Sequence, residues 1–186
     1  MTLTQVSGYE PVPPMVSPLT RGWGAFPEEN LYTGLPASGT YDSGALAVYF
    51  PIWVPSVCVA RRVWWANGAT TSGGATVEVG IYADAGEYKP AAKLISGSAT
   101  QGTASQAQFV DITDTTLTPN LYWLALQAST NTNTTLLRVS LPSSAFDAWV
   151  RMEQSSANPL PATATPVESA TASRVYLFGF STTTIT

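Results

Sequence analysis

Residues 117–126, LTPNLYWLAL, constrain the fold of this chain more than any other stretch. They begin with a turn signal, TPN, that carries proline at its second position. The strand that follows is apolar on both faces, because its side chains alternate between Tyr122, Leu124 and Leu126 on one face and Leu121, Trp123 and Ala125 on the other. A strand of this kind is buried on both sides. The sequence therefore predicts a central strand in a layered β-fold.

Other segments share the period of two that is typical of strands. The clearest is residues 76–83, TVEVGIYA, in which branched apolar side chains alternate with small or polar ones. Residues 46–55 contain Pro51, which cannot donate a ladder hydrogen bond, so we expect an edge strand or two short strands joined at a bend. The remaining expected strands are residues 57–66, 93–97, 108–113, 136–141 and 174–180.

One segment fits a helix instead. In residues 143–154, SSAFDAWVRMEQ, Ser144 can cap the helix, and Phe146, Trp149 and Val150 share one face. Many short strands with closely spaced turn signals predict an all-β fold, an antiparallel jelly-roll-type β-sandwich with at most one short helix. We expect a single sandwich domain over residues 46–186.

Residues 1–45 differ from the rest because proline and glycine interrupt every apolar run, which predicts an extended Pro/Gly-rich N-terminal arm. Ordering such an arm costs about 1–2 kcal/mol per residue, which only the burial of apolar side chains can offset. We expect the arm to lie across a neighbouring subunit, with docking on its own domain as the alternative. The interface candidates are Val12, Met15, Trp23, Phe26 and Leu31.

Composition and charge exclude several classes of partner. Charged residues make up 11% of the chain, against about 25% in ordinary globular proteins. The net charge is −4 and the cations are scattered, so we expect no nucleic-acid binding. Apolar runs fall well short of the ~20 residues of a membrane span, and the N-terminus lacks the basic start and apolar block of a signal peptide. We therefore expect neither membrane insertion nor a signal peptide.

The residues available for catalysis are few. The chain has no histidine, which removes the commonest general base and metal ligand and the usual nucleophile pairs. Its one cysteine, Cys58, lies among apolar neighbours and is expected to be a core residue rather than a reactive thiol. We therefore expect that the protein is not an enzyme and binds no cofactor. We assign no catalytic, metal-binding or cofactor-binding residue.

The acidic residues do not change this expectation. Glu28 and Glu29 are expected to be solvated, and Asp111 and Asp114 flank a turn with too few oxygens for Ca²⁺. Glu78 has no second carboxylate nearby in sequence to form a glycosidase pair.

Among the aromatic residues, Trp64 and Trp65 are adjacent, so they point to opposite faces of a strand. We expect both to be buried, one in the core and one under the arm or a neighbouring subunit. The alternative is a glycan-stacking platform made by Trp64 or Trp65 with Tyr82.

The order of the motifs resembles a known group of proteins. AVYFPIWVP, VARRVWW, an Asn-Gly loop, VEVGIYAD and LTPNLYWLAL follow one another, as in β-sandwich modules of minor tail, tail-fibre and other virion proteins of tailed bacteriophages. Those modules typically carry G-I-Y-x-D, P-G-x-L and L-x-P-G-x-Y-W-L-A. Here residues 80–84, 90–94 and 117–125 match these motifs, with Ala91 and Asn120 in place of glycines. The resemblance spans about residues 31–180.

The resemblance implies a non-enzymatic structural component of a bacteriophage virion, such as a minor tail, tail-fibre or baseplate-associated protein. Such a protein acts through contacts with copies of itself and with other virion proteins. It would be made in the bacterial cytoplasm and reside in the particle, in the tail. A carbohydrate-binding module for host-surface glycans and a capsid decoration or head-fibre protein are the alternatives. The matching motifs occupy turn and core positions, so they carry over no functional residue.

Overall fold

The computed structural model describes residues 22–24, 37–71, 74–86, 88–140, 151–168 and 174–182, and these contain strands and no helix. The predicted all-β fold class is confirmed. The strands are β1 (Gly22–Gly24), β2 (Ala37–Thr40), β3 (Ala47–Val54), β4 (Cys58–Ala66), β5 (Thr76–Asp84), β6 (Pro90–Thr100), β7 (Ala107–Leu117), β8 (Asn120–Ala128), β9 (Thr135–Ser140), β10 (Met152–Gln154), β11 (Val167–Glu168), β12 (Arg174–Tyr176) and β13 (Phe178–Ser181).

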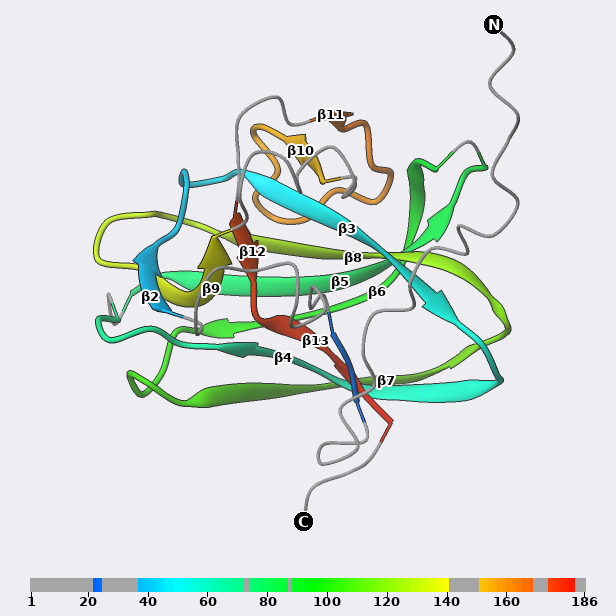
Figure 1. Cartoon of the computed structure of the whole chain (residues 1–186), viewed down its shortest axis with the longest axis horizontal. Helices are drawn as coiled ribbons and strands as arrows, with labels where there is room; N and C mark the ends of the chain where they lie inside the picture. Colours follow the sequence, from blue (N-terminus) through cyan, green and yellow to red (C-terminus); the bar gives the residue numbers. More distant parts are fainter. Residues whose placement is uncertain are drawn as a thin grey trace, which may run out of the picture.

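The strands form two layers of antiparallel sheet (Figure 1). One layer is a six-stranded sheet in the order β11-β10-β3-β8-β5-β6. The other contains a four-stranded sheet, β1-β13-β4-β7, and a three-stranded sheet, β12-β9-β2. These two sheets are continuous at one point, because Asn67, directly after β4, bridges Leu136 in β9. The result is a β-sandwich.

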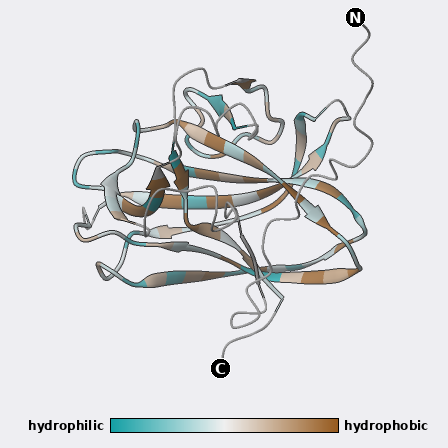
Figure 2. Ribbon diagram, in the orientation of Figure 1, coloured by the Kyte–Doolittle hydropathy of each residue, from teal (hydrophilic) through white to brown (hydrophobic). Residues whose placement is uncertain are grey.

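The main core fills the space between the layers. Phe50 in β3 and Phe178 in β13 meet across it with ring centroids 5.9 Å apart. Strand β8 lies between β3 and β5, as the sequence predicts for a strand that is apolar on both faces. One of its faces, with Leu124 and Leu126, belongs to this core. The brown segments of β3, β5 and β8 in Figure 2 show how many residues of these strands are apolar.

The other face of β8 is covered by residues 155–165, which we call the strap. The strap follows β10 and crosses the outer face of the six-stranded sheet (Figure 1). It closes a second apolar cluster, whose members are Ala47, Tyr49, Tyr82, Trp123, Ala125, Met152, Ala157, Leu160 and Ala164. The strap therefore explains why an aromatic residue of β8 points away from the main core and is still buried.

The helix expected at residues 143–154 is wrong where the structure describes it. Met152–Gln154 is strand β10, and it pairs with β3 so that Met152 lies opposite Tyr49. Pairing with a sheet edge and burial of the Met152 side chain outweigh the helical pattern, since tertiary contacts override weak propensities. Residues 143–150 of this prediction lie outside the described residues.

The domain begins earlier than the sequence analysis places it. Strand β2 pairs with β9, and Tyr41 is buried in the main core, so residues 37–45 belong to the sandwich rather than to an arm. Strand β1 pairs with β13 of the same chain and sets the backbone of Trp23 opposite Phe180. The other arm candidates, Val12, Met15, Phe26 and Leu31, lie outside the described residues.

The remaining strands are present, with two local departures. A register shift between Ala60 and Arg62 in β4 interrupts the alternation, so that Ala60, Val63 and Trp65 are all buried. The strand expected at residues 174–180 is divided at Leu177 into β12, which pairs with β9, and β13, which pairs with β4.

Candidate functional site

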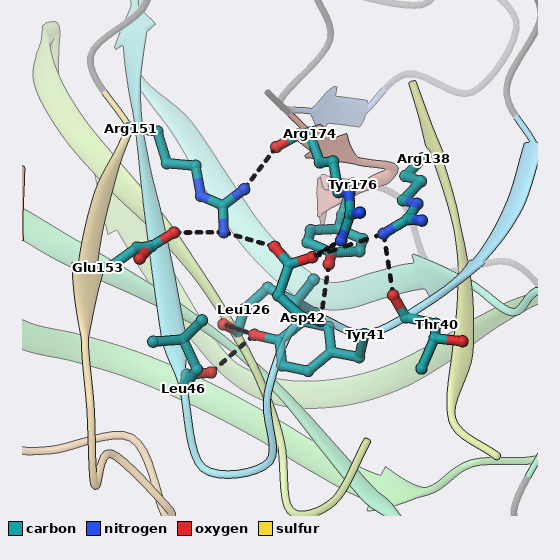
Figure 3. A network of polar contacts seen from close by, with 10 residues as sticks. All are labelled: Thr40, Tyr41, Asp42, Leu46, Leu126, Arg138, Arg151, Glu153, Arg174 and Tyr176. Atoms are coloured by element: carbon teal, nitrogen blue, oxygen red, sulfur yellow. Dashed lines mark hydrogen bonds and ion pairs between the residues drawn. The ribbon is translucent and has the colours of Figure 1, made fainter. Parts of the chain in front are cut away.

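Among the described residues, the densest group of charged side chains lies at one end of the sandwich and consists of Asp42, Arg138, Arg151, Glu153 and Arg174, called here the Asp42 cluster (Figure 3). Asp42 lies in the turn after β2, Arg138 in β9, Glu153 in β10 and Arg174 in β12, and Arg151 directly precedes β10. Because β10 belongs to the six-stranded sheet and β9 and β12 to the other layer, the cluster joins the two layers.

Arg151 is the centre of this cluster, and its side chain is only 1% exposed. Its Nη2 lies 2.8 Å from Asp42 Oδ2 and 2.6 Å from Glu153 Oε1. Its Nη1 donates a hydrogen bond to the carbonyl oxygen of Arg174 at 2.9 Å. A single guanidinium therefore holds two carboxylates and the beginning of β12.

Two further arginines, Arg138 in β9 and Arg174 in β12, also approach Asp42. Arg174 donates to Asp42 Oδ1, and Arg138 lies 3.5 Å from the same oxygen while donating to the carbonyl of Thr40 at 3.0 Å. Burial alone would raise the pKa of the Asp42 carboxyl. The hydrogen bonds from Arg151 and Arg174 outweigh burial and hold this pKa below its usual value.

Two tyrosines line the inner side of the cluster. The hydroxyl of Tyr176 accepts a hydrogen bond from the backbone N–H of Asp42 at 3.1 Å, and its ring lies 5.1 Å from that of Tyr41. The Tyr41 hydroxyl lies 2.7 Å from the carbonyl oxygen of Leu46 and 2.9 Å from that of Leu126. Burial is the main cause that raises the pKa of both tyrosines, so both stay neutral donors or acceptors at ordinary pH. The cluster fastens chain segments together.

A second polar group fastens the strap. Glu78 Oε2 accepts the backbone N–H of Leu160 at 2.8 Å, and Lys93 Nζ donates to the carbonyl of Leu160 at 2.7 Å. The two side chains are themselves 3.6 Å apart. The Tyr82 hydroxyl donates to the carbonyl of Pro161 at 2.7 Å. A glycosidase would need Glu78 to face a second carboxylate. Here the Glu78 carboxylate instead binds the strap backbone at Leu160 and the Lys93 side chain.

Two of the motifs behind the resemblance to phage proteins meet beneath the strap. Tyr82 in β5 lies opposite Trp123 in β8. Trp123 Nε1 donates to Asp84 Oδ1 at 2.8 Å, and the second oxygen of Asp84 accepts the N–H of Gly86 at 2.9 Å. Gly86 has φ +81°, the left-handed conformation that suits glycine. These motif residues thus fix the β5–β6 turn to the central strand.

The structure does not bring together the residues of the expected glycan platform. Trp65 points into the main core, where its Nε1 donates to Asn67 Oδ1 at 3.0 Å. Tyr82 is fully buried under the strap on the opposite layer. Trp64 is partly buried in β4, opposite Phe109 of β7. The three side chains therefore do not form one surface for a sugar ring.

The other singled-out residues have structural partners. Asp111 pairs with Arg62 at 2.5 Å, and Asp114 pairs with Arg61 at 3.5 Å. The described residues contain no group of three or more side chains of the kinds that hold a metal ion. Cys58 is half-buried against the main core, and burial raises the pKa of its thiol.

Sequence reasoning missed the Asp42 cluster. Apart from Arg151 and Glu153, which are two residues apart, its members are separated by longer stretches of chain, and each looks like an isolated surface charge. The one available signal is the low charge content, since the cluster uses three of only eight cations, Arg138, Arg151 and Arg174.

Comparison with family models, curated proteins and solved structures finds no match for this chain. Within the described residues, no helix has the length and apolar character to cross a membrane.

Proposed function

We propose that this protein is a non-enzymatic structural component of a bacteriophage virion, in the tail, its fibres or the baseplate. It acts through contacts with copies of itself and with other virion proteins, and it resides in the particle after synthesis in the host cytoplasm.

The observation that carries this proposal is the use of the charged side chains. The Asp42 cluster ties β9, β10, β12 and the turn after β2 to one another, and the Glu78–Lys93 pair ties the strap to the sheet. The charges of Asp42, Glu78 and Arg151 are largely buried and are compensated within the chain. Removing one partner of a buried pair is far more costly than removing a surface charge. A chain that has few charges and uses them in ion pairs between its own segments is suited to a structural role.

The resemblance supports the same conclusion. The motif residue Trp123 lies opposite Tyr82 and donates a hydrogen bond to Asp84, and these contacts position the β5–β6 turn. These residues have a structural role in this chain, as expected for motifs that recur in virion modules with different partners.

We also infer that the strands of the sandwich are connected in a jelly-roll topology. Strands β3-β8-β5-β6 form one layer, and β2-β9 is linked to β4-β7 in the other by the Asn67–Leu136 bridge. Strands β5 to β8 follow a Greek-key path, because β8 returns across the sandwich to lie beside β5. Jelly rolls are built from two such keys, and capsid domains are among the proteins that use them.

The test is the composition of particles. Virions of the phage that encodes this chain should contain it at a fixed copy number by mass spectrometry after density-gradient purification, and an antibody against it should label one site on the particle in electron micrographs. A protein found in the lysate but absent from purified, infectious particles would contradict the proposal. Retention of the protein on a glycan column would point instead to the carbohydrate-binding alternative.

A further inference from the structure

The end of the sandwich opposite the Asp42 cluster is formed by two neighbouring turns. One joins β3 to β4 and the other joins β7 to β8, and we call residues 53–58 together with residues 117–121 the tip (right in Figure 1). The turns are adjacent because Val54 pairs with Asn120 and Cys58 pairs with Leu117. The brown start of β4 in Figure 2 belongs to this tip.

Large apolar side chains are exposed at the tip. Trp53 is 40% exposed and Val57 is 64% exposed, and both prolines of the turns, Pro55 and Pro119, are exposed beside them. Leu121, opposite Trp53 in β8, is partly exposed on the same face. Such a patch on a folded domain marks a surface that contacts a partner more often than an isolated apolar residue does.

The tip carries no charge. No charged residue occurs in residues 43–60 or in residues 115–137. The nearest charges along these strands are Arg61 and Asp114, which pair with each other. The chain as a whole has a net charge of −4, so two copies repel each other on average. The tip is a place where they can meet without bringing like charges together.

The tip is also held in one conformation. The hydroxyl of Tyr122 accepts the backbone N–H of Thr118 at 3.1 Å and lies 3.1 Å from the carbonyl oxygen of the same residue. The Asn120 side chain accepts the N–H of Leu121 at 2.8 Å. A fixed turn loses little conformational entropy when it binds, and this favours association.

We propose that the tip is an interface between two copies of this chain, related by a twofold axis and centred on Trp53 and Val57. In a twofold contact residue i meets residue j and j meets i, whereas residues on the axis meet their own counterparts, so a favourable centre carries no charge and consists of groups that match themselves. The uncharged tip satisfies this condition. The proposal goes beyond the virion assignment, because it names a surface and a partner that can be tested on the isolated protein.

Two other occupants fit the tip less well. Recognition of a sugar needs several polar groups placed around the aromatic ring, and the tip has one side-chain amide, that of Asn120, whose oxygen already accepts the backbone N–H of Leu121. A membrane surface attracts Lys and Arg beside apolar residues, and the tip has neither.

The experiment is sedimentation equilibrium of the full chain and three single variants that each add one negative charge. Trp53→Glu and Val57→Glu change the tip, and Val167→Glu, at an apolar position that is 69% exposed in β11, is the matched control. The wild type and the control should dimerise with the same micromolar Kd. Each tip variant should weaken dimerisation at least tenfold, about the loss of one central contact. Circular dichroism verifies that each variant is folded.

Three outcomes would overturn the proposal: a wild-type chain that stays monomeric at millimolar concentration, tip variants that dimerise as the wild type does, or a control that is weakened as much as they are. Binding of the monomer to lipid vesicles or to a glycan array that is lost in Trp53→Glu would assign the tip to another partner and also refute it. None of these results bears on whether purified particles contain the protein, so the two proposals fail separately.

Discussion

The two ends of strand β3 are built in opposite ways. Asp42 lies a few residues before its start, surrounded by three arginines, whereas Trp53 lies near its other end in a tip without charge. The strand has eight residues, so about 25 Å of chain separate the two ends. At the first end, distant segments are bound together by charges that are mostly removed from solvent. At the second, a hydrogen-bonded turn exposes apolar side chains. In the part of the chain that the structure describes, the buried charges hold distant segments together, whereas the tip leaves apolar side chains exposed.

The largest effect is expected from breaking the charged end. Arg151→Met should lower the free energy of unfolding by about 3–5 kcal/mol, because it leaves the carboxylates of Asp42 and Glu153 without their buried partner. Urea denaturation measures this loss. Arg61→Met is the matched control: it breaks a surface pair with Asp114 and should cost at most about 1 kcal/mol. Equal losses of unfolding free energy in the two variants would show that the buried cluster stabilises the fold no more than a surface ion pair does.

A smaller effect is expected from acid. The pKa of Asp42 is lower in the folded chain than in the unfolded one, so the unfolded chain binds more protons as the pH falls. The stabilisation by this carboxylate is complete above its ordinary pKa of about 4 and is lost as the pH drops through the lowered folded value. Urea denaturation across this range should show a smaller decrease in Asp42→Asn than in the wild type. Parallel curves would mean that Asp42 does not contribute.

At the tip, loss of an internal hydrogen bond should have a modest effect. Tyr122→Phe removes the hydroxyl that contacts the backbone of Thr118 and should lower the free energy of unfolding by about 1 kcal/mol. Amide hydrogen exchange in residues 117–121 should become faster, since the turn loses the hydrogen bonds between the Tyr122 hydroxyl and the backbone of Thr118. If the exchange rates stay unchanged, other contacts hold the turn.

The smallest effect on stability is expected at the most exposed tip residue. Val57→Ser should change the free energy of unfolding by less than about 0.5 kcal/mol, as is usual for an exposed position. Thermal denaturation of dilute protein measures it. A large loss would mean that Val57 supports the fold rather than a contact surface.

The sequence predicts the long strands more completely than the strap and the short strand that cover them. The alternation in residues 76–83 and 121–126 is a local property, and β5 and β8 appear where it indicates. The strap has no period of its own, and only the two-sided apolar character of β8 implies that something must cover Trp123. Strand β10 was missed because its three residues become a strand only by pairing with β3.

The polar sites were less accessible to sequence reasoning than the strands. Asp42 and Arg174 are far apart in the chain, and their contact depends on where β12 enters the sheet. The alternative of an aromatic platform could not be decided from the sequence for a related reason. Trp65 and Tyr82 belong to different layers, and the sequence alone does not show which face of each layer is covered.

The most direct test of this division of roles is hydrogen–deuterium exchange followed by mass spectrometry at low and high protein concentration. Raising the concentration should slow exchange at the tip, in residues 53–58 and 117–121, and leave the turn after β2 and strands β9, β10 and β12 unchanged. Those segments should already be protected in the dilute monomer, because the Asp42 cluster holds them within the chain. Concentration-dependent protection at the charged end, with none at the tip, would contradict the account.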